Sequence, residues 1–113
     1  MTAYILEPPR QMYDLSSLYE KYKIVPIIPS KVDAMVLRDD PWRLRSYVYG
    51  WAFENFKSGE DFFILTGNLT AVTIAAMAIQ DAIHGPPRLL VYNSDAKAYS
   101  EVLESREPAK NVG

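Results

Sequence analysis

The sequence predicts an α/β fold: a small single-domain sandwich of four to five mostly parallel strands, an antiparallel C-terminal hairpin strand and about three helices. Residues 61–65 (DFFIL) and 88–92 (RLLVY) are continuous apolar runs, and the almost wholly apolar residues 68–84 separate them. A strand that is buried on both faces reads as such a run, and parallel strands need a crossover that is usually a helix. We therefore expect a βαβ unit, with adjacent parallel strands and a right-handed crossover.

Length and composition limit the possible functions. A chain of 113 residues is too short to divide into two pieces that each bury a useful core, so residues 1–103 are predicted as one domain and the polar residues 104–113 as a mobile tail. The net charge of −2 disfavours a nucleic-acid surface, which neutralises many phosphates. The absence of cysteine excludes disulfides, thiol catalysis and thiolate zinc sites.

Two observations favour a soluble, cytoplasmic protein. Residues 1–10 (MTAYILEPPR) lack the basic start and apolar centre of a signal peptide. The longest apolar stretch, residues 69–83, contains polar side chains and is too short to cross a bilayer. We therefore expect no association with a membrane.

The N-terminal segment predicts a strand and a short helix. Residues 2–7 (TAYILE) fit a strand that ends at Pro8, because proline cannot donate to a ladder. Asp14 is a suitable N-cap for a helix that continues to about Tyr22.

The next segment is less regular. Residues 24–28 predict a second strand, and Pro26 within it favours either a place at the edge of the sheet or an irregular stretch. Residues 29–38 stay open between strand, helix and loop, and residues 35–37 (MVL) fit a short strand or a loop with inward apolar side chains.

A second helix begins after Asp40. This residue is expected to cap it, and Pro41 suits its first position because no hydrogen bond is lost there. The helix is expected to end at Ser58-Gly59. Gly50 inside it predicts the close approach of another element. One apolar stripe is formed by Leu44, Val48, Trp51, Ala52 and Asn55/Phe56.

The third helix, residues 68–84, is expected to be covered on most of its circumference. His84, Gly85 and the two prolines that follow form a stop signal. Its narrow exposed strip is predicted to contain Thr70, Thr73, Met77, Gln80, Asp81 and His84.

The C-terminal part predicts a hairpin. Residues 93–96 are turn-forming, and residues 98–103 alternate like a half-exposed strand, with a helix over 96–105 as the competing interpretation. The core is expected to contain Phe63, Leu65, Leu69, Val72, Ala75, Ala76, Ile79, Ile83, Leu90, Val48, Trp51 and Phe56.

The first candidate site is the turn formed by Thr66, Gly67, Asn68 and Thr70. It joins the carboxyl end of a strand to a helix N-terminus, where free N–H groups and the helix dipole favour an anion such as a nucleotide phosphate. Lys31 or Arg38 would supply a positive charge. The turn is neither GxGxxG nor a P-loop, and a βαβ turn needs a glycine and a cap for structural reasons alone.

Catalytic and metal chemistry have little support. His84 is the single histidine and fits a helix cap, so sites that need two histidines are excluded. Asp33, Asp39 and Asp40 form a possible carboxylate cluster, but helix capping explains the last two. No serine lies in a GxSxG motif. We therefore expect no catalytic residue, metal or cofactor, and a protein that is not an enzyme.

The second candidate site is a protein interface. Trp42, Arg43, Arg45 and Tyr49 combine aromatic and arginine side chains on one helix, and interfaces are enriched in both. An aromatic cluster beneath the helices is the alternative. An open sheet edge at the hairpin is a further place where a partner strand would add. The expected partner is another protein or a second copy.

The arrangement of residues 61–68, the alanine-rich helix, residues 89–92 and Tyr99 resembles a pattern in small uncharacterised α/β proteins encoded by bacteriophages. The resemblance implies a phage accessory protein in the host cytoplasm and carries no catalytic residue. A weaker similarity, limited to residues 66–70, is to the Rossmann-like halves of nucleotide-sensing domains in prokaryotic defence systems.

Overall fold

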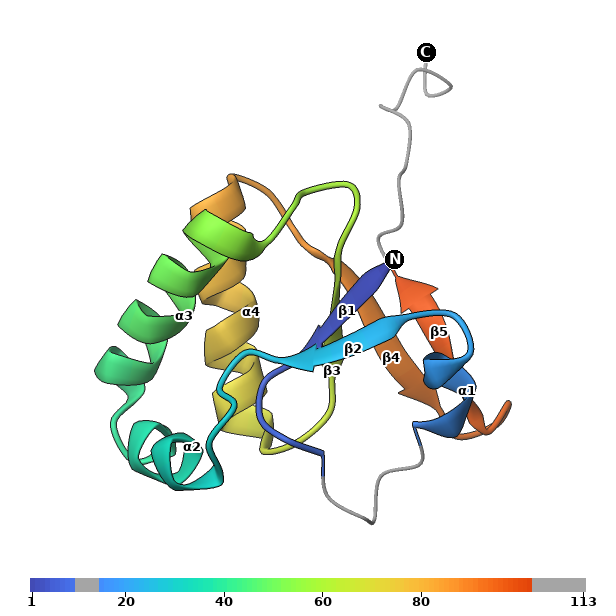
Figure 1. Cartoon of the computed structure of the whole chain (residues 1–113), viewed down its shortest axis with the longest axis horizontal. Coiled ribbons are helices and arrows are strands. Elements are labelled where there is room, and N and C mark those ends of the chain that lie inside the picture. Colours follow the sequence, from blue (N-terminus) through green and yellow to red (C-terminus); the bar gives the residue numbers. More distant parts are fainter. Residues whose placement is uncertain (10–14, 103–113) are drawn as a thin grey trace.

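The computed structural model describes residues 1–9 and 15–102. Asp14, expected as a helix cap, and residues 104–113, expected as a tail, lie outside the described residues. The described residues form a five-stranded sheet and four helices (Figure 1). In chain order these are β1 (Thr2–Ile5), α1 (Ser16–Tyr19), β2 (Lys23–Pro26), α2 (Lys31–Arg38), α3 (Pro41–Asn55), β3 (Phe62–Leu65), α4 (Leu69–Ile83), β4 (Arg88–Asn93) and β5 (Ala98–Val102).

The sheet has the strand order β2-β1-β3-β4-β5, in which the first four strands are parallel and β5 is antiparallel to β4. The expected βαβ unit is confirmed, because β3 pairs with β4 in parallel with Phe63 opposite Leu89. The hairpin is also confirmed, and its second strand is β5 rather than a helix. Strand β2 lies at an edge of the sheet, as Pro26 predicted, but it ends at Pro26 and not at residue 28.

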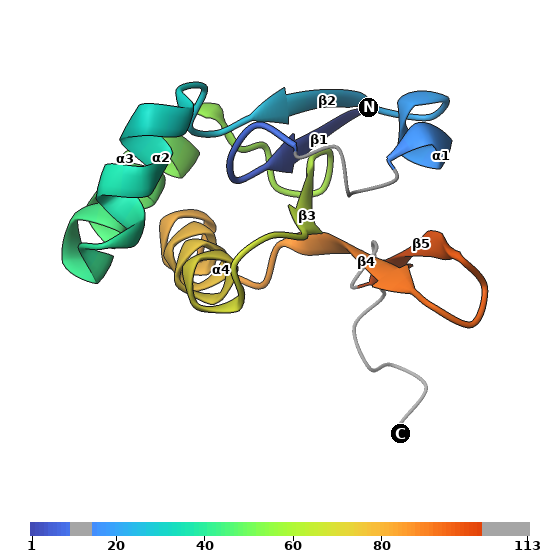
Figure 2. The same ribbon diagram turned by 90° about the horizontal axis from the view of Figure 1, so that it is seen from below.

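The strand order fixes which face each helix covers. The chain steps one way from β1 to β2 and the other way from β2 through β3 to β4. With right-handed crossovers, a reversal of direction moves the connecting helices to the opposite face. Figure 2 accordingly shows α1 on one side of the sheet, and α2, α3 and α4 on the other.

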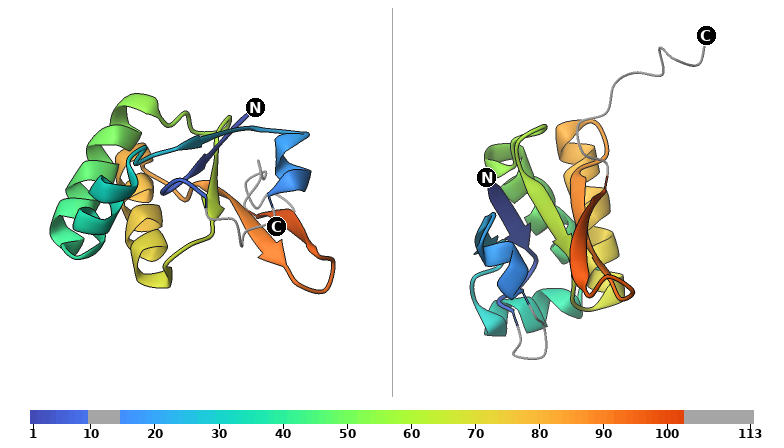
Figure 3. Two further views of the ribbon diagram at one scale, coloured as in Figure 1. Left: turned by 60° about the horizontal axis from the view of Figure 1, so that its bottom comes forward. Right: turned by 90° about the vertical axis from the view of Figure 1, so that its right-hand side faces the viewer.

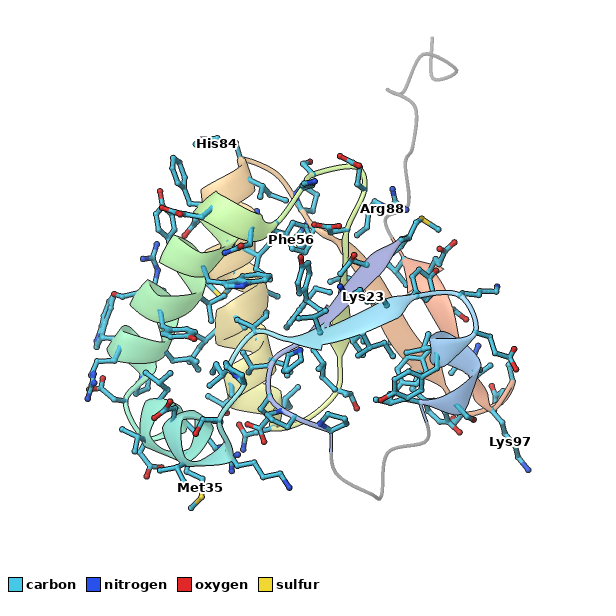
Figure 4. The ribbon with its side chains drawn as sticks, viewed as in Figure 1. Lys23, Met35, Phe56, His84, Arg88 and Lys97 are labelled. Atoms are coloured by element: carbon cyan, nitrogen blue, oxygen red, sulfur yellow. The ribbon has the colours of Figure 1, made fainter. Side chains whose placement is uncertain are left out.

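The larger core lies between the sheet and helices α2 to α4. The small residues Ala71, Ala75, Ala78 and Ala82 form the buried side of α4 and allow its backbone to lie close to β3 and α3. Phe56, just after α3, is buried in the same core, between α3 and the sheet (Figure 4). The other fully enclosed members include Ile27, Ile28, Leu44, Val48, Phe63 and Ile79.

A second core lies on the α1 face, where the sheet curls (Figure 3). Helix α1 contacts both β2 and β5, although these are the two edge strands. The Tyr22 hydroxyl hydrogen-bonds a carboxylate oxygen of Glu101 and joins the two edges of the curl. The cluster is formed by Ala3, Ile5, Leu15, Leu18, Tyr22, Phe62, Ile64 and Leu90.

Most of the expected core is buried, with one error. Leu65, Trp51, Ala76 and Ile83 are half-buried against the larger core. The prediction for Leu69 is wrong, because its side chain is 79% exposed. Leu69 is the first residue of α4 and lies eleven residues before Gln80. It therefore shares the exposed side of that residue at 100° per residue.

The structure answers three further local questions from the sequence. The open segment 29–38 contains helix α2, whose cap Ser30 accepts a hydrogen bond from the Asp33 N–H at 3.3 Å. Helix α3 ends at Asn55, before Ser58-Gly59, because Phe56 turns to an extended conformation and enters the core. The prediction that another element approaches Gly50 is wrong within the described chain, where nothing lies within 4 Å of an added Cβ.

The end of α4 has an unusual residue in its stop signal. His84, and not Gly85, takes the left-handed conformation, with φ 61° and ψ 39°. The Gly85 N–H donates to the Gln80 carbonyl at 3.1 Å, which completes a Schellman motif. A side chain with a Cβ is disfavoured at such a position by roughly 1–2 kcal/mol.

We expect His84→Gly to stabilise the fold by about 0.5–1 kcal/mol, because relief of the left-handed strain exceeds the added entropy of the unfolded chain. His84→Ala is the matched control, since it removes the imidazole but keeps the Cβ. Urea unfolding of the three proteins measures the difference. Equal stability of the glycine and alanine variants would contradict the assignment.

Candidate functional site: an exposed surface on two helices

A row of large side chains runs along the outer side of α3. Asp40 starts the helix by accepting the Arg43 N–H at 3.3 Å, and Pro41 occupies its first position. Trp42, Arg45, Tyr49 and Phe53 then recur at spacings of three and four, so that each turn presents one of them. Trp42 is 77% and Phe53 68% exposed, so these aromatic rings lie largely in solvent.

Helix α4 completes this surface, because α3 and α4 lie side by side (Figure 1). Arg45 forms an ion pair with Asp81 of α4 at 2.7 Å, and its guanidinium lies 5.7 Å from the centre of the Tyr49 ring. Arg45 therefore ties Tyr49 to the neighbouring helix and is itself neutralised. Met77 of α4 is 60% exposed beside this pair.

A small apolar hollow of about 180 Å³ lies between the N-terminal part of α3 and the middle of α4. Trp42 and Arg45 line it from α3, and Ile74 and Met77 line it from α4, with Pro41 at its end. Its volume suits one apolar side chain of a partner rather than a whole small molecule. We call Trp42, Arg43, Arg45, Tyr49, Phe53 and Met77 the α3–α4 surface.

Four of these six residues, namely Trp42, Arg43, Arg45 and Tyr49, were expected from the sequence. Trp42, Arg45 and Tyr49 share one side of α3, whereas Arg43 points about 100° around the helix from Trp42, away from Arg45. Phe53 was missed, although its spacing of four from Tyr49 was a readable signal. Met77 was assigned to the exposed strip of α4 without a role. The alternative expectation, an aromatic cluster beneath the helices, applies to other residues: Tyr4, Trp51 and Phe56 form it.

Helix α2 adds a further exposed apolar group at the same end of the molecule. Val32, Met35 and Val36 are all at least half exposed, whereas only Ala34 and Leu37 of this helix face the core. Figure 4 shows Met35 pointing away from the sheet. Three large outward apolar residues on an eight-residue helix extend the apolar character around the N-terminal ends of α3 and α4.

The expected anion-binding turn is exposed and partly capped by the protein. The Asn68 side chain accepts the Ala71 N–H at 3.0 Å, and Gly67 has φ 123°, which only glycine adopts readily. Thr66 is half-buried, whereas Gly67, Asn68 and Thr70 are exposed. The turn lies at the carboxyl end of β3, beside β1, where the chain reverses its direction through the sheet. This is the switch point at which ligands bind in open α/β sheets.

Arg38, which was expected to supply a positive charge to this turn, is already paired with another residue. Its guanidinium forms two hydrogen bonds with the Glu7 carboxylate, at 2.8 and 2.9 Å. Lys31 is exposed in the first turn of α2. His84 is exposed at the end of α4, and no group of three or more histidine, aspartate or glutamate side chains in the described residues could hold a metal ion.

A second hollow, of about 430 Å³, lies at the amino ends of β1 and β3. Tyr4, Lys57 and Asp61 are among the residues that line it, and the sequence interpretation gave none of them a role. Asp61 is the one buried charged residue of the described chain. Its carboxylate accepts the Lys57 N–H at 2.8 Å, so it closes the turn between α3 and β3. Burial raises the pKa of the Tyr4 phenol, and the Asp61 carboxylate raises it further.

The expected open edge at the hairpin is flanked by another element. Helix α1 lies against β5, and a hollow of about 490 Å³ remains between them, lined by residues that include Leu18, Tyr22 and Tyr99. The Tyr22–Glu101 hydrogen bond crosses this hollow region. A partner strand would therefore meet α1 as well as β5.

Comparison with protein-family models, with curated proteins and with solved structures found no match to this chain. Within the described residues, no helix is long and apolar enough to cross a membrane.

We expect Asp61→Asn to lower the pKa of Tyr4, because it removes the nearby negative charge while burial still keeps the value above that of a free tyrosine. NMR titration of the tyrosine ring carbons, with Tyr4→Phe to assign the signal, measures this change. The raised pKa means that the contribution of Tyr4 to stability is lost as the pH rises through its folded-state value. An unchanged Tyr4 titration in the asparagine variant would contradict the coupling.

Proposed function

We propose that the protein is a non-enzymatic binding protein that uses the α3–α4 surface as a protein–protein interface. The observation that carries this proposal is the row of solvent-exposed aromatic rings on α3, with Trp42 and Phe53 at its ends. Scattered apolar residues are common on protein surfaces, but contiguous ones mark interaction sites. The predicted partner is another protein or a second copy of the chain.

The composition of the surface fits the centre of an interface. Tryptophan, tyrosine and arginine are the residues most often responsible for binding energy, and Trp42, Tyr49 and Arg45 supply all three. The hollow beside Trp42 provides a place for a partner's side chain. Arg45 already pairs with Asp81 at 2.7 Å, and because both side chains are about half exposed this ion pair reduces the freedom of the arginine only modestly.

The charges around the surface favour a protein over a membrane or a nucleic acid. Arg43 and Arg45 are balanced by Asp81, Asp39 and Glu54 in the same region of α3 and α4. Helices that lie on anionic membranes, and surfaces that bind phosphates, carry an excess of positive charge. The net charge of the whole chain is −2.

The biological setting of the proposal is that of a phage accessory protein in the cytoplasm of the host. It rests on the resemblance of residues 61–68, the alanine-rich helix and residues 89–92 to small phage-encoded α/β proteins. A protein that acts by occupying a surface of another protein needs no catalytic residue, in agreement with the lack of catalytic motifs in the sequence.

We expect the double variant Trp42→Ser/Phe53→Ser to lose the assemblies that the wild-type protein forms. Both rings are exposed, so the stability of the fold should change by only about 0.5 kcal/mol. Light scattering of the purified protein detects self-association, and affinity capture from host lysate detects a partner. Tyr19→Ser, which alters an exposed aromatic residue on α1, is the control and should keep every assembly. A wild-type monomer that captures no protein would refute the proposed function.

A second candidate function is the binding of a nucleotide or phosphate at the Thr66–Thr70 turn. The strand order supports it, because it places the turn at the switch point between β1 and β3. The N–H groups of Leu69 and Thr70 form no hydrogen bond to the described protein and remain available to an anion. The Asn68 cap and the pairing of Arg38 with Glu7 weaken the case.

If a nucleotide binds there, a concentration of 100 times its dissociation constant should stabilise the fold by about 2.7 kcal/mol. That gain corresponds to a rise in melting temperature of roughly ten degrees or more. A thermal-shift panel of mono-, di- and cyclic nucleotides measures it, and Gly67→Ala, strained at φ 123°, should abolish the rise. Equal melting temperatures with every nucleotide would exclude this candidate.

A further inference from the structure

Two small residues lie beside the row of large side chains, on the outermost side of α3. Ser46 and Gly50, one turn apart, are exposed between Trp42 and Phe53. A Cβ added at Gly50 would meet nothing within 4 Å in the described chain. A glycine in a helix interior is unfavourable, so packing within the chain gives no reason for it. A smooth gap flanked by aromatic rings lets the backbone of another helix approach closely.

Charges at the two ends of α3 are complementary to each other. Arg43 lies in the first turn and Glu54 in the last, both exposed, and neither side chain forms an ion pair in the described residues. Eleven residues separate them, which is about 16 Å along a helix, so they cannot meet within one chain. They can meet between two antiparallel copies of the same helix.

We propose that a second copy of this chain packs against the outer side of α3, with the two α3 helices antiparallel about a two-fold axis between Ser46 and Gly50. The axis passes the level of residue 48, so the numbers of two residues that face each other across it sum to about 96. Gly50 of each copy therefore faces Ser46 of the other. Arg43 then lies beside Glu54 and Phe53 of the other copy, and Trp42 packs against the same end. The proposal rests on the proposed function of the α3–α4 surface.

The exposed aromatic area is of the size that a dimer needs. Aromatic side chains bury about 150–250 Å² each, so Trp42, Tyr49 and Phe53, at their exposures of 77%, 37% and 68%, offer roughly 400 Å² per copy. A standard interface buries about 800 Å² per partner, of which somewhat more than half is apolar. The net charge of −2 adds little repulsion between two copies.

Charge reversal tests the antiparallel arrangement. We expect light scattering at about 100 µM to give the wild type a mass of twice 12.8 kDa. Arg43→Glu and Glu54→Arg should each weaken the dimer about tenfold, because each creates two like-charged contacts across the axis. The combined variant should recover the wild-type affinity. Lys97→Glu at the hairpin tip (Figure 4) and Glu20→Arg after α1 are controls for net charge and should dimerise normally.

Substitution of Gly50 separates the interface from the fold. Gly50→Ala should raise the melting temperature of the dilute monomer by roughly 2–6 °C, since it favours the helix and its Cβ meets nothing within 4 Å in the described chain. Gly50→Leu should fold equally well but leave only monomers, because its side chain fills the gap. Circular dichroism and light scattering report the two effects.

The outcomes separate this proposal from the one on which it rests. Dimers that persist in Gly50→Leu, or a combined charge variant that fails to recover, would overturn the α3–α3 arrangement. A wild-type monomer that captures another protein through Trp42 and Phe53 would also overturn it, but would leave the interface function intact.

Discussion

The burial of the central strand β3 on both faces is the constraint on which the fold depends. Phe62, Phe63 and Ile64 are fully enclosed, and successive side chains of a strand point to opposite faces. Phe63 therefore needs cover from α3 and α4, whereas Phe62 and Ile64 need cover from α1 and the curled sheet. The reversal of direction after β2, together with right-handed crossovers, provides helices on both faces.

The same reversal creates a topological switch point, which is the position where ligands bind in open α/β sheets. The chain leaves β1 towards one side of the sheet and leaves β3 towards the other, so the turns after these two strands diverge. The Gly67 turn lies there, but its helix is already capped by Asn68. The switch point thus follows from the order of the strands alone, whereas the α3–α4 surface depends on which side chains are exposed on two helices.

The elements that could be predicted are those whose signals are local. The apolar runs of β3 and β4, the almost wholly apolar helix between them and the Gly-Pro-Pro stop identify the βαβ unit without knowledge of the remaining chain. Helix α2 could not be predicted, because most of its large apolar residues lie on its exposed side. Val32, Met35 and Val36 face solvent, and only Ala34 and Leu37 face the core. Sequence-based prediction assumes that large apolar residues are buried, so it assigns the wrong side of such a helix to the core.

The exposure of Leu69 and the open space at Gly50 were missed for the same physical reason. Each prediction assumed a packing role within the fold, namely burial for the apolar Leu69 and a close neighbouring element for Gly50. The structure leaves both unexplained by internal packing, because Leu69 is 79% exposed and nothing in the described chain lies within 4 Å of a Cβ added at Gly50. The candidate interface was predictable in part, because Trp42, Arg43, Arg45 and Tyr49 share one helix, whereas their exposure required the tertiary structure.

Helix α3 carries apolar residues on two opposite sides, and this decides how its surface should be interpreted. Leu44, Val48 and Ala52 fill the inner side against the core, and Trp42 and Phe53 lie on the outer side. A helix that is apolar around much of its circumference is normally covered around as much of it. In the described chain nothing covers the outer side.

The remaining sides of α3 are already fixed. The Tyr47 hydroxyl donates to the Ile27 carbonyl at 3.3 Å on one flank, and Arg45 pairs with Asp81 at 2.7 Å on the other. The outer side is therefore held in position before any partner arrives. The helix backbone therefore has little conformational entropy to lose on association, and the remaining cost is the ordering of the exposed Trp42 and Phe53 side chains.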